Sequence, residues 1–140
     1  MPTIWYLDED EPTISLSEAA KVADAQSGII KKYAEKGNCV IVGRCADYVL
    51  QDRPNLLRVF FHSDIDKRIQ RAMELYDMSE IKAERVIRKT DKQRATYYNR
   101  NTRKRKWGSP NSYDLYLNLG SLGVDKAIDV IIEELDKLDK

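Results

Sequence analysis

VIVGRCADYVL, residues 40–50, begins like a buried strand and ends in a charged turn. Together with Cys39, its first four residues are apolar or lack a side chain, with no alternation of apolar and polar positions. Such a run is typical of a strand buried on both faces of a parallel sheet, here predicted over residues 39–43. Arg44 and Asp47 follow at once. In open parallel sheets, ligands bind beyond the carboxyl ends of strands, so this charged pair is a candidate binding element.

The rest of the chain alternates apolar strands with amphipathic helices. Ser15 and Glu18 have the spacing of a capping box that starts a helix, and Gly37 is a helix stop. The pattern predicts strands over 39–43, 56–63 and 113–119. It predicts helices over 15–36, over 65–76 with Asp64 as the cap, from Ser79 onward and over 124–138. Strands alternating with helices indicate right-handed crossovers. We therefore expect a single α/β domain over residues 1–140, with a mostly parallel sheet flanked by helices on both faces.

Each predicted strand ends in a polar pair. In chain order these pairs are Arg44 with Asp47, His62 with Ser63, and Asn118 with Ser121. Because ligand sites of parallel sheets lie at the carboxyl ends of the strands, these side chains are expected to converge. This convergence is the first functional signal in the sequence. His62 is interpreted as a strand-end residue rather than a catalytic base.

The charge of the chain is concentrated in one internal segment. Residues 82–106 carry eleven Lys or Arg against two carboxylates, a net +9, whereas the whole chain has +1 and the remainder therefore −8. Both ends are acidic, with DEDE at 8–11. Positive charge at this density indicates an anionic ligand near the segment, and a solvated helical face is the alternative.

Composition argues against several classes of protein. No apolar run reaches the ~18 residues of a membrane-spanning helix, and no signal peptide precedes the acidic start. Cys39 and Cys45 are too few and too close for a disulfide framework, which favours a reduced, cytoplasmic setting, with Cys45 as a small packing residue. One histidine and two cysteines also argue against a zinc site, and no metal ligand is assigned.

Three blocks of sequence carry a family resemblance. They are AEKGNCVIVGRCADYVLQDRPNLLRVFFHSDIDKRIQR (34–71), KTDKQRATYY (89–98) and WGSPNSYDLYLNLGSLG (107–123). In this order they resemble the cytidylate kinase-like family of P-loop nucleoside monophosphate kinases, over residues 26–135. The resemblance implies transfer of a phosphoryl group from ATP, with Mg²⁺, to a nucleoside monophosphate, CMP or dCMP.

On the acceptor side, the resemblance implies roles for four residues. Arg44 is implied to bind phosphate, and Asp47 to contact the ribose or the base. Arg68 and Arg71 are implied to bind substrate from the helix that leads to the lid. An ion pair between Arg44 and Asp47 that closes the turn, and a solvated face for the two helical arginines, are the alternatives.

The basic segment corresponds in the resemblance to a mobile lid, over residues 79–110. Arg88 and Arg94 are implied to reach phosphates, and Asp91 to orient the phosphates or the sugar. Arginine suits this role because its planar fork binds two phosphate oxygens at once and keeps its charge. A simple surface pair of Asp91 with Arg94 is the alternative.

On the donor side, the resemblance implies that Asn118 and Ser121 lie beside the base of ATP. The family's Gly-rich phosphate-binding loop, which cradles the donor phosphates with backbone amides, has no counterpart in the printed sequence. The six glycines are 28, 37, 43, 108, 120 and 123, and none follows an N-terminal strand. We therefore expect CMP binding but negligible ATP turnover.

Two hypotheses address the strand that precedes this loop in the family. TIWYL, residues 3–7, fills the central slot of the sheet, and DEDE then stands where the anion cradle would be and attracts a divalent cation or a basic partner. In the other hypothesis the chain is a truncated form. An unfilled slot would leave exposed sheet edges, which makes a homodimer an open alternative.

Two other function classes stay open. The first is an inactive nucleotide-binding or regulatory module that keeps only the acceptor site. The second is binding of RNA or single-stranded nucleic acid through residues 82–106, where aromatic side chains punctuate a basic run. Tyr97, Tyr98 and Trp107 are interpreted as core or hinge packing rather than as stacking platforms.

Overall fold

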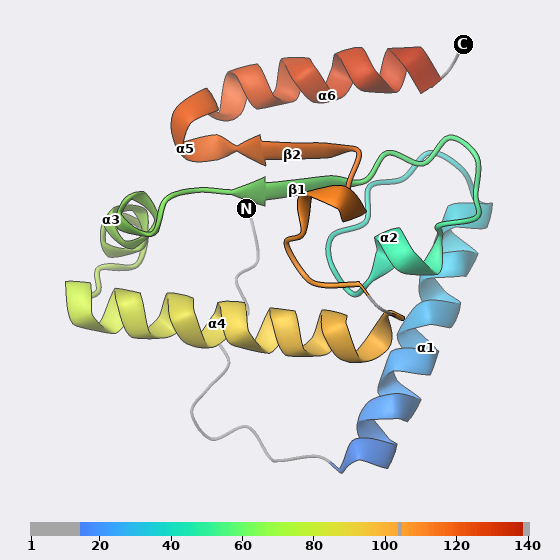
Figure 1. Ribbon diagram of the computed structural model, residues 1–140, viewed down its shortest axis with the longest axis horizontal. Helices are drawn as coiled ribbons and strands as arrows, with labels where there is room; N and C mark the ends of the chain where they lie inside the picture. The colour runs from blue at the N-terminus through green and yellow to red at the C-terminus, as the bar shows by residue number, and fades with distance from the viewer. Residues whose placement is uncertain (1–14, 104, 139–140) are drawn as a thin grey trace.

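The computed structural model describes residues 15–103 and 105–138. Its elements are, in chain order, α1 (Leu16–Glu35), α2 (Ala46–Val49), β1 (Val59–His62), α3 (Ile65–Tyr76), α4 (Glu80–Asn101), a 3₁₀ turn (Pro110–Ser112), β2 (Leu115–Asn118), α5 (Leu119–Leu122) and α6 (Val124–Leu138). The strands pair in parallel, with Val59 opposite Leu115 (Figure 1). This part of the chain is therefore α/β, with mostly helices and a two-stranded parallel sheet.

The predicted helices are confirmed, and α1 and α4 begin at side-chain caps, whereas Asp64 makes no capping hydrogen bond at the start of α3. Ser15 and Glu18 form the capping box of α1: Ser15 Oγ accepts from the Glu18 N–H at 3.2 Å, and the Ser15 N–H donates to Glu18 Oε2 at 2.9 Å. Gly37, just past the end of α1, has φ +92°, which glycine adopts without strain. Ser79 caps α4 with its side chain, and α6 has the predicted bounds.

The two strands are held together at their amino ends by one ion pair. The Arg58 guanidinium donates to both carboxylate oxygens of Asp114 at 3.1 Å, and the Arg58 backbone N–H donates to Oδ2 at 2.8 Å. Each strand is four residues long, shorter than the predicted 56–63 and 113–119. The strands are shorter because the apolar pattern marks residues that are shielded from solvent, and these outnumber the residues that form hydrogen bonds between the strands.

The predicted strand over 39–43 is wrong. These residues have no regular structure and pair with no strand in the described ranges. Val40 is 92% exposed and Val42 is 88% exposed, whereas Ile41 packs toward α1. An apolar run predicts burial, but a strand also needs a neighbouring edge to satisfy its backbone N–H and C=O groups. The hypothesis that residues 3–7 supply that edge lies outside the described residues.

Side chains pack in two clusters, one around buried residues and one of partly exposed aromatic rings. The first joins α1 to α2, and consists of the buried Ile30, Ala46 and Leu50 with Ala34, Ile41, Val49 and Leu56 packed against them. The second is aromatic and surrounds Phe60 of β1, whose ring stacks on Tyr116 and meets Trp107 edge-to-face, each at 5.4 Å. Trp107 is therefore a packing residue, as predicted. None of the helices described has the length and apolar character needed to cross a membrane.

Candidate functional site

The turn that follows residues 39–43 has an unusual backbone. Gly43, Arg44 and Cys45 have φ values of +72°, +55° and +58°, and the Gly43 carbonyl accepts from the Ala46 N–H at 3.2 Å. These φ signs define a tight left-handed turn, which Gly and Asn normally provide. A left-handed conformation costs a non-glycine residue about 1–2 kcal/mol. The turn therefore holds two strained residues, and such strain is concentrated at functional sites.

Cys45 supports this turn as a packing residue, as predicted. Its side chain is buried, and this burial together with the negative charge of Asp47 raises the pKa of the thiol to about 11. Because the thiolate is the reactive form, a buried thiol with a raised pKa is a poor nucleophile.

Asp47 is bound to the C-terminal end of α4. The Tyr98 hydroxyl donates to Asp47 Oδ2 at 2.7 Å, and Arg105 Nη1 lies 3.9 Å from the same oxygen. Tyr98 is only 5% exposed, and burial together with the bond to Asp47 raises its pKa well above the usual value. The alternative of an Arg44–Asp47 ion pair is not found, since Asp47 pairs with Arg105 instead. Tyr98 is a packing residue, as predicted.

Arg44 lies beside the same helix but makes a different kind of contact. Its guanidinium lies over the Tyr97 ring, 5.2 Å from the ring centroid, at a distance typical of a cation–π interaction. The Tyr97 hydroxyl in turn donates to Gln26 Oε1 of α1 at 2.6 Å. Arg44 is exposed and has no hydrogen bond or ion pair with any residue of 15–103 or 105–138. Its charge is therefore available to a ligand.

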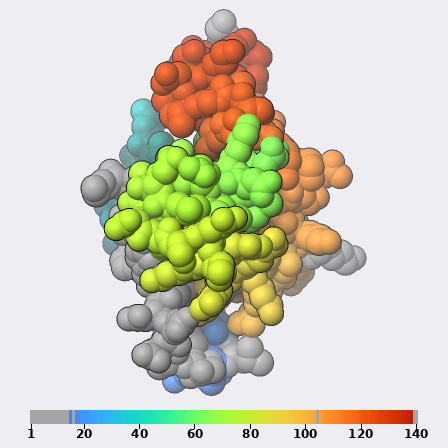
Figure 2. All heavy atoms as spheres, turned by 90° about the vertical axis from the view of Figure 1, so that its left-hand side faces the viewer, coloured from blue at the N-terminus to red at the C-terminus, as the bar shows by residue number. Residues whose placement is uncertain are grey.

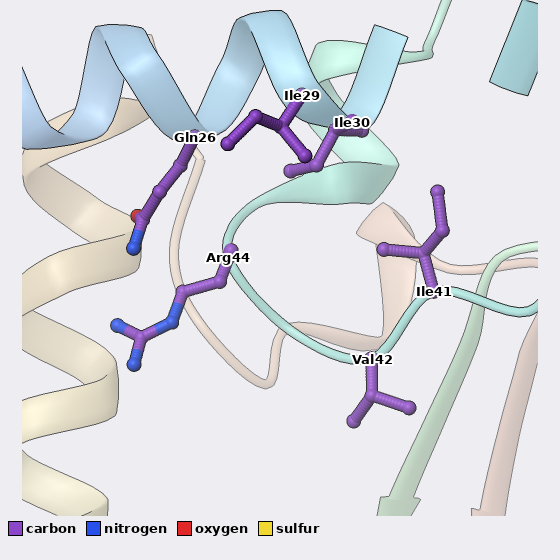
Figure 3. Close-up of a pocket in the computed structure, with 6 residues that line it drawn as sticks. All are labelled: Gln26, Ile29, Ile30, Ile41, Val42 and Arg44. Atoms are coloured by element: carbon purple, nitrogen blue, oxygen red, sulfur yellow. The ribbon is translucent and has the colours of Figure 1, made fainter. Parts of the chain in front are cut away.

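A shallow pocket of about 170 Å³ opens next to Arg44. Its lining residues come from α1 and from the segment before the turn, and are Gln26, Ile29, Ile30, Ile41, Val42 and Arg44 (Figure 3). Figure 3 shows the side chains of Arg44 and Gln26 both pointing toward α4. Sites for whole small molecules usually measure about 300–1,000 Å³, so this pocket has room for only part of such a molecule.

The helices α3 and α4 bring two other predicted site residues together. Arg68 of α3 donates to both carboxylate oxygens of Asp91 of α4, each at 2.7 Å. Figure 2 shows α3 side by side with the first part of α4. Arg88 donates to Glu84 one turn earlier at 2.9 Å. Asp91 thus pairs across the helices rather than with Arg94.

Arg71 and Arg94 are exposed and have no ion pair with a described residue. Arg94 precedes Tyr97 by three residues on α4, which places it on the same side of the helix, about 5 Å along the axis. Arg94, a predicted phosphate ligand, therefore lies close to Tyr97, the residue of α4 that contacts Arg44. Arg88 lies about 13 Å along the axis from Tyr97 by the same helical rise.

Asn118 and Ser121 meet at the start of α5. Asn118 Oδ1 accepts from the Ser121 N–H at 3.3 Å, and Ser121 Oγ donates to the Asn118 carbonyl at 3.3 Å. Gly120 between them packs so closely on Ser63 that an added Cβ would collide with the Ser63 hydroxyl. These contacts form a helix cap at the end of β2.

The described residues contain no cluster of metal ligands. Within residues 15–103 and 105–138, no group of three or more His, Cys, Asp or Glu side chains is placed to hold a metal ion. The turn at Gly43 leads only into the four-residue helix α2, which is too short to cradle phosphates at its N-terminus. The acidic residues 8–11 lie outside the described ranges.

Two residues of the site were not expected from the sequence. Gln26 lines the pocket and bonds Tyr97, and Tyr97 contacts Arg44, although the pattern assigns Tyr97 only to packing. A signal for Gln26 was present, because it lies four residues from both Val22 and Ile30 on the apolar side of α1. A polar side chain on an apolar helix face requires a partner.

The fold and the site define an α/β protein in which a strained turn places a free arginine beside a small pocket. The family model of the cytidylate kinase-like family matches residues 6–121. A crystal structure of an uncharacterized protein from Eubacterium ventriosum ATCC 27560 is 38% identical in sequence with a TM-score of 0.78, covering 83% of this chain and 65% of that one. The search of curated proteins found no match.

This chain belongs to the cytidylate kinase-like family, since the family model covers most of its length. The resemblance read from the sequence is thereby confirmed. The chain spans 65% of the length of the solved structure that it matches, so the activity of a whole kinase is a matter for proposal.

Proposed function

We propose that this chain binds a nucleoside monophosphate, CMP or dCMP, with Arg44 as the phosphate ligand. The observation that carries the proposal is the state of the Arg44 guanidinium, which is exposed, held over an aromatic ring and without a carboxylate partner among the described residues. A cation in this state is suited to the two oxygens of a phosphate group. The apolar wall of the adjacent pocket suits a base.

The other implied contacts are part of the same proposal. Asp47 would reach the ribose or base with Oδ1, because Oδ2 is bound by Tyr98. Arg94 would add positive charge from α4, and phosphoryl transfer depends mainly on such positioned charge. By family resemblance, we propose a P-loop fold with helices on both faces of the sheet and a cytoplasmic location. In that fold the phosphoryl donor would be ATP, bound with Mg²⁺. For this chain we propose acceptor binding with negligible ATP turnover.

Calorimetric titration tests the acceptor site directly. CMP is expected to bind in preference to UMP, AMP and ATP, and Arg44→Ala should weaken CMP binding about 10- to 100-fold, as loss of a charged hydrogen bond does. Arg53→Ala is the matched control, because Arg53 is an arginine paired with Glu35 and does not line the pocket. Equal CMP affinity in the wild type and Arg44→Ala would rule out this site.

Nucleic-acid binding is the second candidate, and the exposed cations of α4 favour it. Lysine and arginine side chains project from this helix without a described ion-pair partner, at Lys82, Arg85, Lys89, Lys92, Arg94 and Arg100. Phosphate-backbone binding weakens steeply with salt, by about 10³–10⁵ between ~50 and ~200 mM for extensive contacts. RNA binding with that salt dependence, unchanged by Arg44→Ala, would support this candidate over the mononucleotide site.

A further inference from the structure

Three parts of the chain meet at one tyrosine. Tyr97 lies on α4, its hydroxyl donates to Gln26 of α1 at 2.6 Å, and its ring lies under the guanidinium of Arg44 in the strained turn. Tyr97 is half-buried, and this burial raises the pKa of its hydroxyl above the usual value. The hydroxyl therefore keeps its proton at neutral pH and remains the donor to Gln26. The ring is fixed at both of its ends, by the helix and by this hydrogen bond.

An aromatic ring holds an arginine in a way that a carboxylate does not. Arg68 shows the contrast, because both of its described bonds go to the carboxylate of Asp91, which neutralises the charge. The face of a tyrosine ring attracts the guanidinium but accepts none of the N–H donors in the guanidinium plane. Arg44 thus keeps its full charge and its donor fork, while the ring favours one placement of the guanidinium.

We infer that Tyr97 is a positioning residue, which holds the Arg44 guanidinium ready for the phosphate of the bound nucleotide. The inference rests on the proposed function and adds to it a determinant of the phosphate contact. A pre-positioned side chain binds more tightly, because less conformational entropy is lost when the ligand arrives. Since Tyr97 belongs to α4, the placement of this helix also sets the placement of Arg44.

A comparison of CMP with cytidine isolates this role, because the two ligands differ only in the phosphate. Tyr97→Leu removes the ring and is expected to weaken CMP binding about two- to fivefold, the range of an exposed cation–π contact, while cytidine binding stays unchanged. Tyr97→Phe keeps the ring and should retain most of the preference for CMP. In the Arg44→Ala background, Tyr97→Leu should have no further effect on CMP.

Tyr33→Leu is the matched control, because Lys36 lies over the Tyr33 ring at the same 5.2 Å but outside the pocket. It should leave CMP affinity unchanged. If Tyr97→Leu weakens CMP and cytidine equally, or weakens CMP further in the Arg44→Ala background, the inference is overturned while the nucleotide site stands. The inference is also overturned if Tyr97→Phe weakens CMP binding as much as Tyr97→Leu does. If wild-type CMP binding does not depend on Arg44, the proposed function itself fails.

Discussion

At the residue scale, two kinds of arginine stand out by their charge pairing. Arg58 and Arg68 each donate two bonds to one carboxylate, and these pairs join elements that are distant in sequence. Arg44 and Arg94 have no such partner among the described residues. Bidentate pairs of the first kind stabilise the fold, whereas free guanidinium groups of the second kind are available to an anion.

The Arg58–Asp114 pair predicts how stability depends on pH. Bonds from Arg58 hold the pKa of Asp114 below its usual value near 3.8. In the unfolded chain that usual value applies, so the pair contributes its full stability above it and loses the contribution as the pH falls through the lower folded pKa. Asp114→Asn should lower the unfolding free energy by about 1 kcal/mol at neutral pH, since the pair is partly exposed.

Urea unfolding between about pH 7 and about pH 2 measures this dependence. The difference between wild type and Asp114→Asn should shrink toward zero at the acid end. Asp129→Asn, on the exposed side of α6, is the control and should change neither the free energy nor its pH dependence. A difference that stays constant down to about pH 2 would contradict the assigned ion pair.

At the scale of elements, the local signals placed the helices, whereas strand pairing was predicted correctly for only two of the three expected strands. Ser15 and Ser79 cap their helices through hydrogen bonds to residues less than four positions away. The sequence was therefore sufficient to place the starts of α1 and α4. A strand depends on a partner that can lie anywhere in the chain. Residues 39–43 have the apolar content of a strand, but no described segment bonds with them. The turn after them was still found, because its charged residues interrupt an apolar run.

The contact between α3 and α4 also could not be read from the sequence, and it gives a prediction at this scale. Asp91 lies 23 residues from Arg68, and both side chains are about one-third exposed, at 27% and 34%. Asp91→Asn should lower the unfolding free energy by about 1–2 kcal/mol, because two charged hydrogen bonds are lost from a partly buried pair.

Glu84→Gln is the matched control on the same helix. Its partner Arg88 is 64% exposed and lies one turn away, so the loss should not exceed about 0.5 kcal/mol. Both variants are compared with the wild type by urea unfolding. The dependence of the unfolding free energy on urea concentration should be the same in all three proteins. Equal effects of the two substitutions would show that the α3–α4 pair adds no more than a surface pair does.

At the scale of the whole molecule, much apolar surface of the described residues is exposed. Val40 and Val42 are the extreme cases, and α6 exposes a stripe of Val124, Ile128, Ile132 and Leu135, each at least 43% accessible. Exposed apolar surface of this kind favours association with another chain, and an unpaired extended segment does so in particular. We propose that a homodimer forms by association of two copies through residues 39–43.

The double substitution Val40→Thr with Val42→Thr tests whether these valines face solvent. Threonine keeps the branched shape and adds a hydroxyl, so at two exposed positions the unfolding free energy should change by less than about 0.5 kcal/mol. Self-association, measured by sedimentation velocity over a range of concentrations, should decrease because apolar surface is removed.

Ile30→Thr, in the buried cluster between α1 and α2, is the contrast variant and should lower the unfolding free energy by more than about 2 kcal/mol. If the double substitution destabilises the protein as much as Ile30→Thr does, the valines are covered in solution. The segment 39–43 would then be the buried strand that its sequence predicts.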